Sequence, residues 1–395
     1  MLFYYLSLIP ISRICTLTGI YKSKDILYFL YFASPLLFVY SSSFLIETTL
    51  LFFIVSSVLF FLKIISNYSN INFLLLLFCL TTAGLTKITS LPPILITFGI
   101  VTLIKFRNSL FSYKPILLII IFIISSIFSL SWSIFATNSN AENILLANSE
   151  LNTGPTLYRW LFGTFEQRID PYFYSMIFFR GFILSSMFVP LIYTLSNFKK
   201  IGPFSNFFES KNLHILIFFL IPMLSMIIFS NLYFVHDYYF IHFIPLLILC
   251  FCSLYEKSFF ITKCRLNYFL VIYLLCSILI FFGYYNSKNN FTDFENEFLE
   301  ISNYLNGKIT KNDFIIVDNN GNWNPIISYY AKAPSVYTLK LRNLEFINKN
   351  INEIGKNKNL KFIISCDYNN FNYISINYGE FVHKTKNCAI WKIEK

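Results

Sequence analysis

The sequence is poor in charged residues. Only 13% of its 395 residues are Asp, Glu, Lys or Arg, whereas soluble globular domains contain about 25%. Hydrophobic residues make up 56% of the chain, and its mean hydropathy is +0.59. These values exclude an ordinary soluble domain and predict an integral, multi-pass membrane protein.

Several catalytic and nucleotide-binding motifs are absent. The chain has no G-x-x-x-x-G-K-[ST], no G-x-G-x-x-G and no H-E-x-x-H, which removes support from ATP-driven transport and zinc proteolysis. It also has no D-x-D, which argues against a cytosolic, metal-dependent nucleotide-sugar site. The sequence predicts no metal ligands and requires no cofactor, and it leaves a divalent metal open.

Acidic residues are scarcer than basic ones. The chain has 20 Asp and Glu against 31 Lys and Arg, which gives a formal charge of +11. In a membrane protein such an excess sets topology and surface potential. No nucleic-acid motif accompanies the charge, so we expect no nucleic-acid partner.

Long apolar runs dominate residues 1–285, which we expect to form a mainly α, transmembrane helical bundle. Residues 72–104 are apolar but broken by "TKITSLPP". That break predicts two short helices meeting at Lys87, or one span followed by a re-entrant segment. Residues 1–12 are apolar but too short to predict a span. Runs near the 20 residues that cross a bilayer are 26–45, 48–65, 115–135, 173–194, 213–231, 237–254 and 266–285.

The basic residues predict one orientation for all the loops. Placing every basic cluster in the cytoplasm satisfies the positive-inside rule. Glu47, Lys87, loop 136–172, the turn at His236 and the tail then lie outside the cytoplasm, as expected for a protein of the cell inner or plasma membrane. The clusters are Arg13, Lys22 and Lys24; Lys105, Arg107 and Lys114; Lys199, Lys200 and Lys211; and Lys257, Lys263 and Arg265.

Loop 136–172 is the long outer loop. It mixes polar residues with the aromatic stretch "LYRWLFGTF". Such a stretch is typical of an amphipathic helix lying in the membrane interface. A plain solvated loop is the alternative.

The tail, residues 286–395, is more polar and carries β-like runs. These are "FIIVD", "SVYTL", "KFIISCDY" and "CAIWKIEK", and the helical patterns "NPIISYYAKA" and "NLEFINKNINEIG" lie between them. Strands that alternate with helices predict a small, extracytoplasmic α/β domain.

The eight cysteines fall into two groups. Six lie in or beside apolar spans, where Cys behaves as a small hydrophobe. Cys366 and Cys388 lie on neighbouring predicted strands of the tail. A disulfide and two buried free thiols are both open for this pair.

Polar residues gather at the predicted outer face, where burying an unpaired charge is costly. Glu47 opens a span, Lys87 lies in "AGLTKITSLPP", and His236 and Asp237 lie in "NLYFVHDYYF". Cations suit a phosphate and acids suit a hydroxyl. We therefore expect one convergent site. For His242 we expect a hydrogen-bonded structural role.

Four segments resemble landmarks of the type C glycosyltransferases, the polyprenyl-phosphate-sugar-dependent family of protein mannosyltransferases and aminoarabinose transferases. "SPLLFVYSSSFLIETTLLFF" resembles the stretch that leads to an acidic helix start, and "AGLTKITSLPPILI" resembles the glycine-leucine turn before a lysine. "HDYYFIHFIPLL" resembles the late loop with paired tyrosines, and "NGNWNPIISYYAKAP" resembles the tail domain of bacterial members. The landmarks follow the family's order and cover most of the chain.

The resemblance implies transfer of a sugar from a polyprenyl-phosphate carrier, the donor substrate, to an acceptor outside the cytoplasm. Partners would be membrane lipid, the lipid-linked sugar and a glycan, lipid or protein acceptor. Lys87, Arg159 and Arg168 would hold the lipid phosphate, whose departure builds negative charge. Glu47 matches an acidic position near the acceptor or donor. Contacts with the sugar or phosphate would come from His236, Asp237, Tyr238, Tyr239, Tyr329 and Tyr330.

One feature of the family pattern is missing. The family's catalytic carboxylate lies in an acidic pair soon after the first helix, but no acidic pair precedes Glu47. The chain is thus expected to lack the N-terminal helix and first catalytic loop, as a truncated or inactive member would. Glu47 or Asp237 is the candidate for the role of general base.

Two other functions remain open. One is that of a catalytically inactive membrane protein that keeps the fold for lipid or partner binding. The other is that of a surface-polysaccharide polymerase or ligase, although loop 136–172 has two arginines and no histidine, unlike the Arg- and His-rich loop of that class. A transporter would show internal repeats and paired broken helices, which the sequence lacks.

Overall fold

The computed structural model divides the chain into two compact units, which we describe separately. The helical unit contains residues 1–136 and 154–287, and the C-terminal unit contains residues 137–153 and 288–395. The residues that the structure describes are 1–41, 46–67, 69–141, 154–196, 209, 212–257, 263–285, 293–310, 312–318, 327, 331, 336–339, 359–366, 374 and 379–393.

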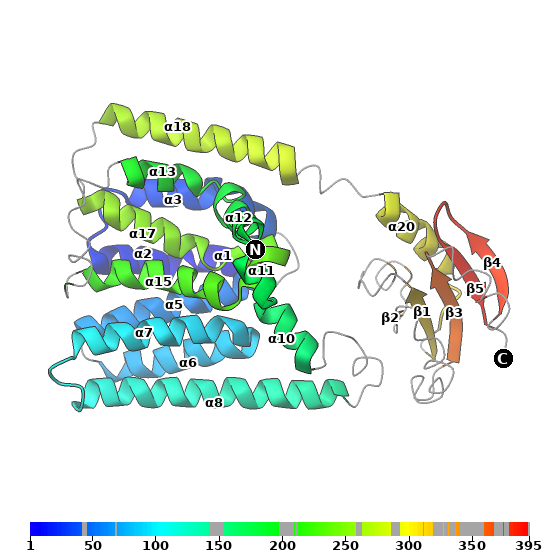
Figure 1. Cartoon of the computed structure of the whole chain (residues 1–395), viewed down its shortest axis with the longest axis horizontal. Helices are drawn as coiled ribbons and strands as arrows, with labels where there is room; N and C mark the ends of the chain where they lie inside the picture. Colours follow the sequence, from blue (N-terminus) through cyan, green and yellow to red (C-terminus); the bar gives the residue numbers. More distant parts are fainter. Residues whose placement is uncertain are drawn as a thin grey trace. The chain divides into compact units, whose positions relative to one another are not determined.

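The helical unit is built from apolar helices that pack around a continuous buried core (Figure 1). Its first half contains α1 (Leu2–Leu6), α2 (Leu8–Thr18), α3 (Lys24–Ala33), α4 (Pro35–Ser41), α5 (Glu47–Ser66), α6 (Asn70–Thr86), η1 (Ile88–Ser90), α7 (Leu91–Lys105) and α8 (Tyr113–Ala141). Its second half contains α10 (Gly154–Phe162), α11 (Phe165–Ile169), α12 (Pro171–Phe178), η2 (Phe179–Ile183), α13 (Phe188–Ser196), α15 (Leu213–Ile228), α16 (Ser230–Val235), η5 (Asp237–Phe240), α17 (Ile244–Lys257), α18 (Lys263–Ile280) and η6 (Phe281–Tyr285).

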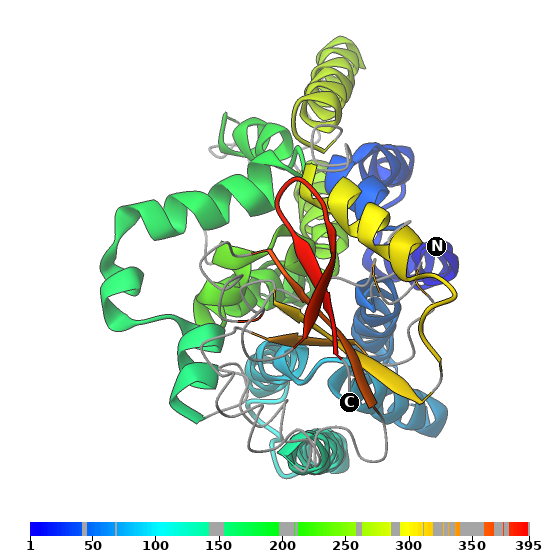
Figure 2. The same ribbon diagram turned by 90° about the vertical axis from the view of Figure 1, so that its right-hand side faces the viewer.

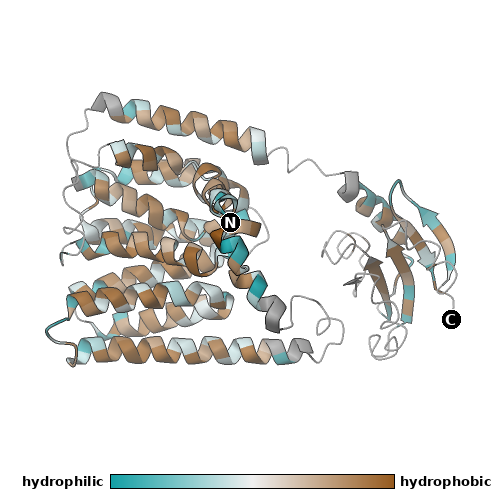
Figure 3. Ribbon diagram, in the orientation of Figure 1, coloured by the Kyte–Doolittle hydropathy of each residue, from teal (hydrophilic) through white to brown (hydrophobic). Residues whose placement is uncertain are grey.

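Four helical segments among the described residues are long and apolar enough to cross a membrane, or five if a bent pair is one span. They are Glu47–Ser66, Ile88–Lys105, Tyr113–Ala136 and Leu266–Tyr284, with the pair Pro171–Ile183 and Phe188–Ser196 as the fifth. Most residues along the helices of this unit are hydrophobic (Figure 3). The long apolar helices suggest a multi-pass membrane protein, in agreement with the composition.

The two most exposed candidate spans lie at opposite edges of the helical unit. Figures 1 and 2 place α8 at one edge and α18 at the other. Only 22% and 17% of their apolar windows are buried, against 67% for α5. An apolar helix with an exposed apolar face needs an apolar surrounding, so these two helices are suited to face lipid.

Two predicted spans are interrupted. The run 26–45 is not one helix, because Ser34 has an extended backbone between α3 and α4. Pro35 follows it, and the residue before a proline avoids the helical region. Residues 42–45 lie outside the described part. The run 173–194 is also wrong as a straight span, since its two helical pieces meet at 95°.

The bend between η2 and α13 is fixed by hydrogen bonds from other helices. Ser186 has a positive φ of 63°, and its Oγ lies 2.9 Å from the Oγ of Ser277. The carbonyl of Ser185 accepts bonds from Ser34 Oγ at 3.1 Å and from Tyr273 Oη at 3.3 Å. These buried partners offset the strain of the left-handed backbone.

Each of the other predicted spans corresponds to one or two helical elements. The run 213–231 divides into α15 and α16, and 237–254 into η5 and α17, because neither is helical throughout. Runs 48–65, 115–135 and 266–285 match α5, α8 and α18 with η6. The break in 72–104 is confirmed, since α6 ends at Thr86 and Lys87 is extended.

The predicted outer loop contains short helices. The aromatic stretch is helical to Phe162, where Gly163, with a φ of 75°, ends α10. Thr164 then caps α11 by accepting a bond from Gln167 N–H, and Gln167 bonds back to Thr164 N–H. The helix prediction is therefore confirmed over the plain loop, while a position at the membrane interface stays a prediction.

The C-terminal unit contains helix α20 (Asp293–Leu305) and a sheet of five strands in the order β2-β1-β3-β5-β4. Edge strand β2 (Val336–Leu339) and the next two strands, β1 (Asp313–Asp318) and β3 (Asn359–Ser365), are parallel. β5 (Ala389–Lys392) pairs antiparallel with both β3 and β4 (Glu380–Lys384). The mixed sheet confirms four predicted strands, and β4 and α20 were not predicted.

Two connections in this unit were predicted to be helical. Within 324–333 the structure describes only Ile327 and Ala331, and the amide of Ala331 donates to the carbonyl of Ile327 at 3.1 Å. The pattern at 343–355 lies outside the described residues.

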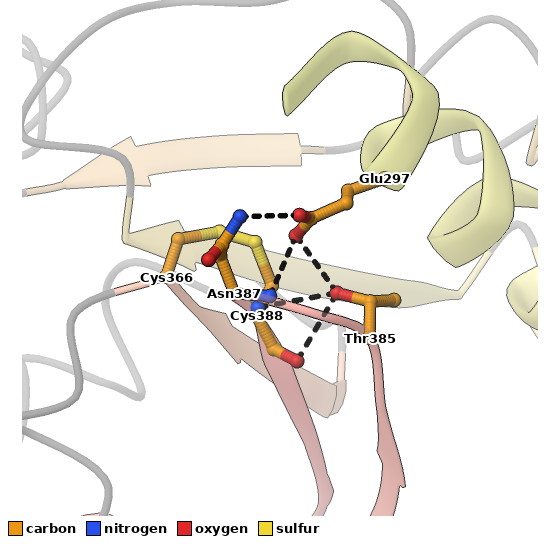
Figure 4. The surroundings of a disulfide bond; sticks show 5 residues. All are labelled: Glu297, Cys366, Thr385, Asn387 and Cys388. Carbon is orange, nitrogen blue, oxygen red and sulfur yellow. Dashed lines mark hydrogen bonds between the residues drawn. A yellow bond between two sulfur atoms is a disulfide. The ribbon is translucent and has the colours of Figure 1, made fainter. Parts of the chain in front are cut away.

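A disulfide and a buried carboxylate hold the end of the sheet together (Figure 4). Cys366 and Cys388 form a disulfide. Glu297 of α20 accepts bonds from Thr385 Oγ1 at 3.0 Å, from Asn387 N–H at 3.0 Å and from Asn387 Nδ2. The helix is thereby tied to the turn between β4 and β5.

Candidate functional site

A buried ion pair joins the start of α5 to the end of α6. Lys87 Nζ donates to Glu47 Oε1 at 2.9 Å, and the two side chains are 14% and 4% exposed. The other carboxylate oxygen of Glu47, Oε2, is buried and has no hydrogen-bond partner among the described residues. Burying two charges is costly, so an ion pair with an unsatisfied oxygen marks a candidate site.

Local backbone chemistry places Lys87 in this position. Lys87 is extended, which ends α6, while its N–H still donates to the carbonyl of Ala83. Ser90 Oγ donates to the carbonyl of Lys87 at 2.8 Å. The prolines that follow sit in the first turn of α7, where a missing N–H costs no helical bond. The chain therefore turns at Lys87 and presents its side chain to Glu47.

An aromatic wall covers the lysine. The ammonium of Lys87 lies 3.4 Å from the ring centroid of Tyr239 and 5.5 Å from that of Tyr238. The two tyrosine rings stack at 4.8 Å, and His236 stacks on Tyr238 at 4.8 Å. Cation–π contact helps to stabilise a partly desolvated ammonium.

A second carboxylate belongs to the same cluster. Asp237 is 5% exposed, and its Oδ1 accepts a 2.6 Å bond from the hydroxyl of Tyr40 in α4. The ring of Tyr40 lies 6.1 Å from Tyr238, edge to face, and Trp160 of α10 lies 5.6 Å from His236. Residues from four helical elements, α4, α5, α10 and η5, thus converge with Lys87 and His236 of the turns on one polar cluster, which we call the helix-end cluster.

The two basic groups in the turns of this cluster are perturbed in the same direction. Burial lowers the pKa of Lys87, and Glu47 opposes the change. Burial also lowers the pKa of His236, and the positive charge of Arg180 adds to this effect. The lowered pKa favours the neutral imidazole of His236, in which one ring nitrogen carries a lone pair.

Arg180 is a site residue that the sequence analysis missed. It lies in the π-helical η2, its Nη1 is buried without a hydrogen-bond partner among the described residues, and its Cζ is 5.9 Å from the ring of Phe234. A Cβ at Gly181 would overlap the ring of Phe240 in η5, so the glycine permits the close packing that brings Arg180 here. The available signal is an arginine inside the apolar run 173–194.

The structure does not bring every predicted residue together. Arg168 donates from Nε to the carbonyl of Phe162 at 2.8 Å and from Nη2 to that of Ile228 at 3.0 Å. It therefore caps the ends of α10 and α15, as a cation near C-terminal carbonyls does. Arg159 is exposed. Tyr329 and Tyr330 lie outside the described residues.

His242 differs from the expectation. It is 2% exposed and packs edge-to-face on Phe243 at 4.0 Å, but its Nδ1 is buried and has no hydrogen-bond partner in the described part of the chain. The predicted hydrogen bond is therefore absent at this nitrogen.

The helix-end cluster combines carboxylates, cations and aromatic rings, and it lacks an obvious metal site. No group of three or more His, Cys, Asp or Glu among the described residues is placed to hold a metal ion. Cations can bind a phosphate, carboxylates can accept a proton, and rings can stack on a sugar.

No family model, curated protein or solved structure matches the chain. The functional argument therefore depends on the residues of the chain itself.

Proposed function

We propose that the chain is a multi-pass membrane glycosyltransferase, similar to the type C family. It would move a sugar from a polyprenyl-phosphate carrier to a glycan, lipid or protein acceptor on the extracytoplasmic face. One observation carries the proposal. Three segments that resemble family landmarks meet through Glu47–Lys87, Lys87–Tyr239 and Tyr40–Asp237 contacts.

The charges of the cluster suit a phosphate leaving group. In the proposed step the acceptor oxygen bonds to the anomeric carbon as the bond from that carbon to the phosphate oxygen breaks. The polyprenyl phosphate leaves with the electron pair of the broken bond, so negative charge grows on its oxygen. Lys87 and Arg180 would stabilise that charge, because preorganised cations act strongly where water is excluded.

The acceptor proton needs a base. Glu47 Oε2 has no hydrogen-bond partner in the described structure, so it is the atom proposed to take the proton. Asp237 already accepts a bond from Tyr40, and we assign it to orient the sugar. His236, Tyr238 and Tyr239 form a stacked aromatic surface against which a sugar ring would lie.

The test measures sugar release by the purified full chain in nanodiscs that contain synthetic polyprenyl-phosphate hexoses. Glu47→Gln is expected to lower the rate by about 10²-fold or more, as loss of a general base does. Arg180→Gln is expected to lower it by a similar factor. Lys63→Gln is the matched control, because Lys63 lies in the last turn of α5, which begins at Glu47. Equal rates in all four proteins would contradict the proposal.

A second candidate function also has an observation in its favour. Lys87 and Glu47 already neutralise each other at 2.9 Å, as they would in a protein that binds a lipid-linked sugar without turning it over. Retention of the donor by the wild-type chain without sugar release, and its loss in Arg180→Gln, would favour this function.

A further inference from the structure

An apolar groove lies between α7 and the start of α8, away from the helix-end cluster. Its volume is about 590 Å³, within the range of ligand pockets. Figure 1 shows the two helices joined by the short connection at residues 106–112. The groove is lined by Gly99, Thr102, Leu103, Leu110, Phe111, Pro115, Ile116, Ile119, Ile120 and Phe122.

The residues that line the groove favour an apolar ligand. The hydroxyl of Thr102 donates to the carbonyl of Phe98 within its own helix at 2.7 Å. The other lining side chains are apolar, so water in the groove would find few partners. Gly99 leaves room, since a Cβ there would meet nothing within 4 Å.

The surroundings of the groove are basic. Lys105 ends α7, Arg107 lies in the connection, and Lys114 lies one residue before Pro115 of the lining. An apolar groove with three nearby cations therefore complements a molecule with an apolar chain and an anionic head.

The exposure of the lining indicates a lipid of the bilayer. Phe111 is 94% exposed, and Ile119 of α8 is 50% exposed. The groove continues into the apolar face of α8, one of the least buried candidate spans. Since α7 runs about 22 Å from Leu91 to Lys105 at 1.5 Å per residue, the cations lie near the other end of the bundle from Lys87.

We infer that this groove binds one anionic phospholipid, with an acyl chain along the groove and the phosphate near Lys105, Arg107 and Lys114. The site is separate from the helix-end cluster, so the inference is independent of the proposed function. Basic residues at the cytoplasmic end of membrane helices attract anionic headgroups with a strength that adds up over the charges.

The first test measures which lipid stays bound. The full chain is reconstituted in nanodiscs of equal parts phosphatidylglycerol and phosphatidylcholine, and retained lipids are counted by native mass spectrometry. The wild type is expected to prefer phosphatidylglycerol by at least about tenfold. Each of Lys105→Gln and Arg107→Gln is expected to lower that preference about fivefold. Lys63→Gln, which removes a cation outside the groove, is the matched control and should leave the preference unchanged.

The second test fills the groove without changing the charge. Gly99→Leu places a side chain in the open space and also favours the helix, so a loss of folding is not expected. It should lower the number of retained lipids of both headgroups. The inference is overturned by equal retention of the two lipids in the wild type, by an equal loss in Lys63→Gln and Lys105→Gln, or by unchanged retention in Gly99→Leu.

Discussion

The two units each contain a deeply buried glutamate, and their surroundings differ. Glu47 of the helical unit faces a lysine and keeps one oxygen without a hydrogen bond. Both carboxylate oxygens of Glu297 in the C-terminal unit accept bonds from the turn between β4 and β5. Both glutamates are 5% exposed or less.

The difference separates a site from a structural support. A carboxylate whose oxygens are all bonded stabilises one conformation and has little left to offer a ligand. A carboxylate with an unpaired oxygen beside a cation carries a cost that a bound partner would relieve. We therefore assign function to the cluster at Glu47 and fold stability to the cluster at Glu297.

The largest effect is expected from leaving Glu47 without its cation. Lys87→Met should destabilise the helical unit by about 3–5 kcal/mol, because the charge of Glu47 remains buried without a partner. The double variant Lys87→Met with Glu47→Gln should recover most of that loss. Denaturant titration in detergent measures both, and equal instability of the single and double variants would contradict the ion-pair argument.

Removal of Glu297 tests the structural side of the comparison. Glu297→Ala should cost about 3 kcal/mol, since it leaves the buried hydroxyl of Thr385 and the half-buried donors of Asn387 without this acceptor. Amide hydrogen exchange at Cys388 and along β5 is the measurement. Glu300→Ala is the matched control on the same helix, where the carboxylate is 56% exposed and a surface ion pair contributes little. Similar exchange in both variants would remove the special role of Glu297.

Reduction of the disulfide tests how much it stabilises the turn between β4 and β5. Cys366 and Cys388 are 22 residues apart, so opening the bond should cost about 3 kcal/mol by loop entropy. Adding a phosphine reductant should then lower the unfolding midpoint of the C-terminal unit. The variant Cys366→Ala with Cys388→Ala should show no response to the reductant. A wild type that is also unresponsive would indicate two free thiols.

Tyr40→Phe tests how much the hydrogen bond from Tyr40 to Asp237 stabilises the helix-end cluster. It removes one hydrogen bond to Asp237 and keeps the ring contact with Tyr238, so a loss of about 1–2 kcal/mol is expected. Tyr5→Phe is the control, because Tyr5 is 53% exposed. Thermal unfolding in nanodiscs compares the two, and no difference between them would mean that the bond is not stabilising.

The smallest effect is expected from acid at Asp313 of β1. Burial raises its pKa, but bonds from Thr310 and Lys361 outweigh this, so the pKa lies below its usual value. A lowered pKa contributes stability above the unfolded value near 3.9, which is lost as pH falls through the folded pKa. Amide exchange of β1 and β3 from pH 5 to pH 2 should show that loss. Asp313→Asn should lack it, and an equal response in this variant would exclude Asp313 as the cause.

Much of the fold was predictable where a single segment determines its own structure. The run 48–65 is uniformly apolar and forms α5, and "TKITSLPP" breaks the helix at Lys87. Four strands followed from short β-branched runs. β4 was missed, because the structure leaves much of it exposed and its sequence carries no apolar run.

The site was predictable only in part. Glu47, Lys87, His236, Asp237, Tyr238 and Tyr239 stood out as polar groups between apolar runs, and the structure brings them together. Tyr40 looked like one more aromatic residue in a predicted span. Arg168 looked like a phosphate ligand, but it caps two helix ends. Nothing in the local sequence distinguishes these uses of a side chain.

The sequence by itself determined the apolar helices, the break at Lys87 and the polar residues between the spans, because hydropathy and proline act over a few residues. Only the tertiary structure decided which polar groups meet. Gly181 lets η2 pack on η5 and lets Arg180 lie against the ring of Phe234, and α4 carries Tyr40 to Asp237. These contacts join residues far apart in the chain, and packing of whole helices, rather than local preference, selects them.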